Sequence, residues 1–116
     1  MKVCFLIPSY QHSKSIQKIL EDLSPFKMPC VVVNDGSDEF HTDNLRRICS
    51  QYAFVDLVEH EENQGKGGAV ITGLKRALDL KNSHAIQIDS DGQHDLQKIK
   101  DLLDEAKKHP YAVISG

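Results

Sequence analysis

Short apolar runs alternate along the chain with stretches in which apolar residues recur at helical spacing. The apolar runs expected to form strands are residues 3–7, 30–33, 54–58, 85–89 and 111–114. Spacings of three and four residues predict helices around residues 16–23, 45–52, 70–82 and 96–106. This alternation predicts an α/β fold with a mostly parallel sheet, helices on both faces and right-handed crossovers.

Capping residues are available where three of these helices should begin. Ser13 or Ser15 is expected to cap the first helix, Thr42 the second and Asp95 the last. No repeat, low-complexity tract or linker interrupts the pattern. We therefore expect residues 1–116 to form a single domain.

Composition excludes some classes of function. The formal net charge is -3 and no Lys/Arg cluster is present, so nucleic acid is not an expected partner. Three widely spaced cysteines are typical of reduced, buried thiols in a cytoplasmic protein. No apolar stretch reaches about 18 residues, so no membrane segment is expected here, although a longer parent protein can be membrane-associated.

Polar clusters follow four of the predicted strands. They comprise residues 8–11, 34–38, 63–68 and 89–93. Because the carboxyl ends of parallel strands share one rim, and open α/β sheets bind their ligands there, these clusters should converge. Taken alone, the first cluster could merely end a strand, the second could be an ordinary turn and the third a flexible entry to a helix.

The last cluster contains Asp89-Ser90-Asp91, with Gln93 two residues further on. Two carboxylates and an amide oxygen are suitable ligands for a hard divalent cation such as Mg²⁺ or Mn²⁺. With 11 Asp in the chain, however, about one Asp-x-Asp is expected by chance. The spacing alone does not establish a metal site.

The glycine-dense loop at residues 65–68 has two interpretations. Free N–H groups at a helix start, with Lys66 beside them, can bind an anion, or the loop is simply a flexible entry to the helix. It lacks the Walker A pattern, and Val70 stands where the dinucleotide fingerprint needs Gly or Ala.

The histidines show no helical pairing for metal. His94 is a candidate for an indirect role by its position next to the acidic cluster. The others are interpreted as surface or loop residues: His12, His41, His60, His84 and His109.

Taken together in order, four segments carry a resemblance. They read IPSY at residues 7–10, VVVNDGSD at 31–38, NQGKGGA at 63–69 and DSDGQHD at 89–95. With them the chain resembles the amino-terminal, nucleotide-binding half of family 2 glycosyltransferases, in the branch of the dolichyl-phosphate mannose synthases. The resemblance spans essentially the whole chain. It implies a GT-A-like three-layer α/β/α sandwich with a Rossmann-like nucleotide-binding half.

The resemblance also implies roles at the nucleotide. Asp35 would hydrogen-bond the base, and Pro8 and Tyr10 would line the base pocket. Lys66 would lie beside the nucleotide, and Asp89 near the ribose and the metal. Two residues depart from the family pattern: Gln11 stands where the family often has Asn, and Asn34 where it often has Asp. Both departures bear on which base the chain prefers.

At the metal, Asp91 would coordinate the cation that bridges the donor diphosphate, with Asp89 near it and Gln93 as a further oxygen ligand. The implied reaction is transfer of a sugar, with inversion, from a nucleoside diphosphate sugar to an acceptor such as a polyprenyl phosphate or a saccharide. In the family the general base lies in the second half, beyond the position of Gly116. The chain is therefore expected to bind nucleotide and to turn over little by itself.

Two other classes of protein share parts of this pattern. A dinucleotide-binding oxidoreductase fragment would explain the glycine loop and an acid after it, and would bind NAD without metal. A receiver-like or scaffolding α/β module would use its acidic rim for Mg²⁺ or for a partner protein, and would bind metal without nucleotide synergy. Neither explains the segments at 34–38 and 63–69.

Overall fold

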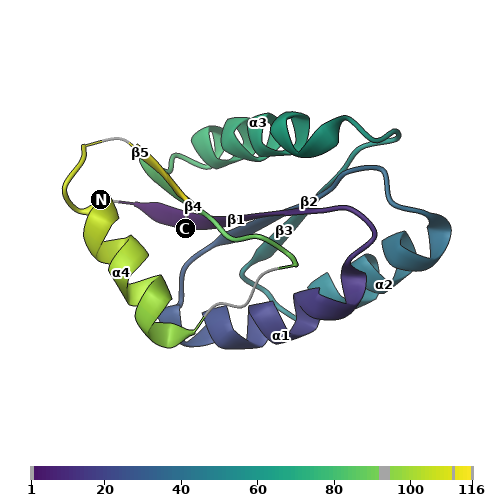
Figure 1. Ribbon diagram of the computed structural model, residues 1–116, viewed down its shortest axis with the longest axis horizontal. Helices are drawn as coiled ribbons and strands as arrows, with labels where there is room; N and C mark the ends of the chain where they lie inside the picture. Colours follow the sequence, from purple (N-terminus) through teal and green to yellow (C-terminus); the bar gives the residue numbers. More distant parts are fainter. Residues whose placement is uncertain (1, 92–94, 111, 116) are drawn as a thin grey trace.

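Parallel strands in the order β3-β2-β1-β4-β5 form one sheet in the computed structural model (Figure 1), which describes residues 2–91, 95–110 and 112–115. The strands are β1 (Val3–Ser9), β2 (Cys30–Asn34), β3 (Val55–Glu59), β4 (His84–Gln87) and β5 (Ala112–Ser115). The helices are α1 (Ser13–Leu23), the 3₁₀ turn η1 (Ser24–Phe26), α2 (Glu39–Cys49), α3 (Gly65–Asp79) and α4 (Leu96–Ala106). None of the described helices has the length and apolar content that crossing a membrane requires.

The sheet is covered on both faces, as Figure 1 shows: α3 lies on one side and α1, α2 and α4 on the other. Successive side chains of β1 divide between these layers because a strand alternates its faces. Phe5 and Ile7 belong to the core beneath α1, α2 and α4, whereas Leu6 packs with Ala69 of α3. The predicted three-layer α/β/α sandwich with a parallel sheet is therefore confirmed.

The last crossover departs from the expected handedness. The connections β3–α3–β4 and β4–α4–β5 move in the same direction across the sheet, but α3 and α4 lie on opposite faces, so the two connections have opposite hands. β4 and the residue after it explain the difference. Ile86 and Ile88 join the core cluster of Ile99 and Leu102 of α4, while the small Ala85 belongs to the cluster of Ala77 on the α3 side.

The predicted N-cap residue is wrong for α1 and α2 and is confirmed for α4. The N-cap of α2 is Asp38 and not Thr42, because the Asp38 carboxylate accepts the N–H of His41 at 2.9 Å. That hydrogen bond lowers the pKa of Asp38. Asp95 caps α4 as predicted, accepting the N–H of Lys98 at 2.7 Å.

At α1 the N-cap is His12, without a side-chain capping bond, so neither predicted serine caps this helix. The two hydroxyls bind other elements instead. Ser13 Oγ lies 2.7 Å from Nδ1 of His41, and Ser15 Oγ donates to the carbonyl of Ser90. The second contact ties the first turn of α1 to the loop that follows β4.

Candidate functional site

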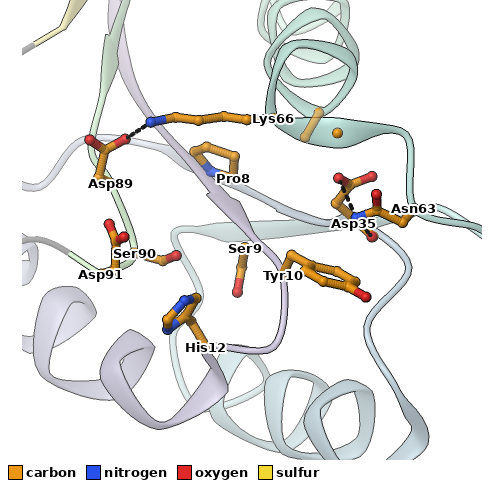
Figure 2. Close-up of a pocket in the computed structure, with 12 residues that line it drawn as sticks. Pro8, Ser9, Tyr10, His12, Asp35, Asn63, Lys66, Asp89, Ser90 and Asp91 are labelled. Carbon is orange, nitrogen blue, oxygen red and sulfur yellow. Dashed lines mark hydrogen bonds and ion pairs between the residues drawn. The ribbon is translucent and has the colours of Figure 1, made fainter.

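A cavity of about 360 Å³ opens at the carboxyl ends of the central strands (Figure 2). Residues from all four polar clusters line it, so their predicted convergence is seen in the structure. The six predicted site residues that the structure describes all line this cavity: Pro8, Tyr10, Asp35, Lys66, Asp89 and Asp91. Gln93 lies outside the described residues, as does His94, and their roles stay predictions.

Asp35 is the buried acid of the cavity. It follows β2 directly and is 2% exposed, a position where an unpaired carboxylate would be costly. Its Oδ1 accepts from the backbone N–H of Gln64 and from Nδ1 of His60, each at 2.8 Å. Its Oδ2 accepts from the Asn63 amide at 3.1 Å. The loop before α3 therefore folds around this carboxylate.

His60 was interpreted from the sequence as a surface or loop residue; it does lie in the loop after β3, but its side chain is buried and not on the surface. Its side chain is 7% exposed and lies between Asp35 and Thr72, whose Oγ1 is 2.7 Å from Nε2. His84 is also buried, with its ring between Ser83 and the carbonyl of His109. The signal for His60 was its position, one residue after β3, on the same rim as the other clusters.

The glycines of the third cluster form the first turn of α3 and not a separate loop. The approach of this segment to the second cluster is close. A Cβ added at Gly36, whose φ is +71°, would lie 2.4 Å from the backbone nitrogen of Asn63. Only glycine fits there, since both the conformation and the space exclude a side chain. This contact brings the start of α3, with Gly65 and Lys66, to the rim of the cavity.

Lys66 reaches across the cavity to the acidic corner, where its Nζ lies 2.7 Å from Oδ1 of Asp89 (Figure 2). The two side chains are 58% and 34% exposed, so solvent screens the pair. Asp91 is exposed at the same corner. The Lys66 ammonium therefore lies against one of the two carboxylates of this corner.

The donor set at this corner fits a divalent cation only in part. Within residues 2–91, 95–110 and 112–115, no group of three or more His, Cys, Asp or Glu is placed to hold a metal. Mg²⁺ is nevertheless commonly held by one or two carboxylates together with substrate phosphates and water. Asp89 and Asp91 match that pattern, in which metal and nucleotide bind together.

The cavity has further polar residues that the sequence did not single out. Ser9, at the end of β1, is 2% exposed, and no hydrogen-bond partner for its Oγ is found among the described residues. His12 and Ser90 also line the cavity, near Asp91 in Figure 2. A buried hydroxyl without a partner beside an open cavity is a group that a ligand can satisfy.

The two departures from the family pattern lie beside the cavity and do not line it. The side chain of Gln11 hydrogen-bonds Asp38 through both its oxygen and its nitrogen. Asn34 is buried, accepting the N–H of Ser37 and donating to Thr42. Both side chains therefore hold the turn after β2.

Comparison with known proteins decides the family. The sequence model of Glycosyl transferase family 2 matches residues 4–116, which is nearly the whole chain. The chain belongs to this family. Its four polar clusters, all within the matched range, are the segments that line the cavity.

The relatives include proteins named as dolichyl-phosphate glycosyltransferases. The UDP-N-acetylglucosamine–dolichyl-phosphate N-acetylglucosaminyltransferase of Methanococcus voltae is 30% identical, with 92% of this chain and 49% of that protein aligned. The dolichyl-phosphate beta-glucosyltransferase of Saccharomyces cerevisiae is 28% identical, with 89% and 34% aligned. The chain thus spans half or less of the length of these relatives.

A solved structure supports the fold. A mannosyltransferase from Pyrobaculum calidifontis, in complex with GDP-Man and Mn²⁺, matches with a TM-score of 0.58 and 26% identity. The match covers 66% of this chain and 24% of that one. The expected likeness to GT-A glycosyltransferases is therefore confirmed at the level of fold and family.

Proposed function

We propose that this chain is the donor-binding part of a glycosyltransferase that uses a nucleoside diphosphate sugar together with Mg²⁺ or Mn²⁺. The observation that carries the proposal is that residues of all four family segments line one and the same cavity. The names of the relatives favour a polyprenyl phosphate as acceptor. Membership of the glycosyltransferase family argues against the dinucleotide oxidoreductase alternative.

The nucleotide end of the site is assigned to Asp35, with Pro8 and Tyr10 beside it. Asp35 is a buried, oriented acceptor that suits an N–H group of a base. Tyr10 is 47% exposed at the rim, which leaves its ring available for stacking on a ligand. Lys66, at the start of α3, supplies positive charge between this end and the acidic corner.

The diphosphate end is assigned to Asp91 and Asp89, with Gln93 as a further ligand by resemblance. A divalent cation held there would stabilise the negative charge that develops on the leaving diphosphate. Lys66 pairs with Asp89, and with a nucleotide bound this ammonium would lie near the same phosphates. A family enzyme of this kind would transfer the sugar with inversion, and no described residue is assigned as the general base.

Binding of UDP and GDP, each titrated with and without Mn²⁺, tests the proposal. We expect at least one of them to bind more tightly with Mn²⁺, because the two carboxylates need phosphate oxygens to complete the coordination. Metal binding that is independent of either nucleotide would favour the scaffolding module instead. Absence of any metal-dependent nucleotide binding would overturn the proposed function.

Asp91→Ala should remove the metal dependence and leave the fold intact. We expect Mn²⁺-supported binding to weaken by roughly tenfold or more, the scale seen when even indirect metal contacts are lost. The melting temperature should hardly change because Asp91 is exposed. Asp104→Ala on α4, where the side chain is 69% exposed, is the matched control. If Asp91→Ala unfolded the protein, Asp91 would be structural and its assigned role wrong.

A further inference from the structure

We infer that His60 is a positioning residue for nucleotide binding, because it fixes the Asp35 carboxylate through a buried Asp35–His60–Thr72 hydrogen-bond chain. The inference rests on the proposed function. It adds a residue that the four family segments do not contain, since His60 lies between the second and third of them.

The donor and acceptor groups largely determine where the hydrogen atoms lie in the Asp35–His60–Thr72 hydrogen bonds. An ionised carboxylate only accepts hydrogen bonds, so the proton shared between His60 and Asp35 belongs on Nδ1. In the neutral ring, Nε2 is then an acceptor, and the Thr72 hydroxyl at 2.7 Å donates to it. Asp35 thus determines the tautomer, and the Thr72 hydroxyl satisfies the ring nitrogen that this tautomer leaves as an acceptor.

Three structural elements hold the Asp35–His60–Thr72 hydrogen bonds in place. Asp35 follows β2, His60 follows β3 and Thr72 lies within α3. The backbone N–H of His60 also donates to the carbonyl of Asn34 at 2.8 Å, which extends the pairing of β2 with β3 by one step. The ring therefore has little freedom, and neither does the carboxylate that it binds.

The hydrogen bonds leave capacity on the carboxylate for a ligand. A carboxylate has about four lone-pair sites. His60 and Gln64 bind Oδ1, and Asn63 binds Oδ2, so three are in use among the described contacts. Asp35 also lines the cavity. One acceptor position thus remains for a donor N–H of a bound base, and its direction depends on where His60 holds the carboxylate.

Loss of His60 should affect binding at the nucleoside end of the site and not at the phosphate end. His60→Leu should weaken Mn²⁺-supported binding of the UDP or GDP that the protein prefers by about tenfold, the loss typical of one hydrogen bond to a charged group. Binding of inorganic pyrophosphate with Mn²⁺ should stay the same, because it needs only the acidic corner. Thr72→Val, nearly equal in volume, should give a smaller loss of the same kind.

His60→Asn is the matched rescue. The Asn side-chain amide can donate from close to the place of ring Nδ1, so this variant should recover part of the nucleotide affinity that His60→Leu loses. In the wild type, the ¹H–¹⁵N spectrum should show His60 as the Nδ1–H form. Thermal unfolding of each variant shows whether the protein is folded, and Thr72→Val keeps the test usable if a His60 variant is not.

The outcomes distinguish this inference from the proposed function. If the wild type binds nucleotide but folded His60→Leu and Thr72→Val bind it equally well, the positioning role is overturned and the proposed function stands. Equal losses for nucleotide and pyrophosphate would also overturn it, since His60 would then be a general structural residue. If the wild type binds no nucleotide with Mn²⁺, the proposed function and the positioning role of His60 are both overturned.

Discussion

The ion pair between Lys66 and Asp89 occupies part of the corner that we propose binds a metal ion. The Nζ–Oδ1 distance is 2.7 Å, although both side chains are partly exposed. Such a pair contributes little to stability because water screens it. Its position matters more, since the ammonium lies against one of the two carboxylates assigned to the metal. Under the proposed function, Lys66 would compete with a divalent cation for Asp89.

Lys66→Met should strengthen metal binding in the absence of nucleotide. We expect the affinity for Mn²⁺ alone to rise roughly two- to fivefold, the equivalent of an exposed ion pair of up to about 1 kcal/mol. Titration of Mn²⁺ followed by electron paramagnetic resonance measures this. Lys18→Met, which removes an exposed pair with Asp22 on α1, is the control. An unchanged or lower Mn²⁺ affinity in Lys66→Met would show that the two cations do not compete.

At the scale of elements, α3 is placed by small residues. It packs on β1 and β2, and its first five residues contribute Gly65, Lys66 and Ala69 to the cavity. A Cβ added at Gly73 would lie 2.0 Å from Cδ1 of Leu6, a side chain that is fully buried in β1. The close approach of helix and strand at Gly73 therefore helps to determine where Lys66 sits.

Gly73→Ala should destabilise the protein although alanine favours helices. Overpacking of this kind costs about 1–3 kcal/mol, which exceeds the gain of up to about 1 kcal/mol in helix propensity. Gly67→Ala in the same helix is the matched control, because a Cβ there meets nothing within 4 Å. It should raise the free energy of unfolding in urea. Equal effects of the two substitutions would contradict the packing argument.

The elements also show what the sequence could and could not predict. The strands were predictable because buried parallel strands are apolar runs, and the rule for strand ends brought six site residues into one cavity. His60 was missed because its burial depends on Thr72, a residue of another element. Likewise, strand spacing places Ile86 and Ile88 on one face of the sheet, but it does not reveal that α4 covers that face.

At the scale of the whole molecule, the three cysteines lie in the cores on both sides of the sheet. As predicted, Cys4, Cys30 and Cys49 are free and buried. Cys4 lies in the cluster on the α3 side, and the other two lie in the core on the opposite side. Burial raises the pKa of Cys4 and of Cys49 to about 11, and raises that of Cys30 as well.

These raised pKa values predict a loss of stability in alkali. Between pH 9 and 11 the unfolded chain releases thiol protons that the folded chain retains, so the free energy of unfolding falls as pH rises through this window. Below pH 9 the contribution is complete and independent of pH. Urea unfolding across the window measures the slope, and the double variant Cys4→Ala/Cys49→Ala is the control. It should start less stable, because cavities replace two buried thiols, and then decline less steeply. Parallel slopes would mean that these thiols ionise without unfolding, and the two layers would then be open to solvent at the cysteines.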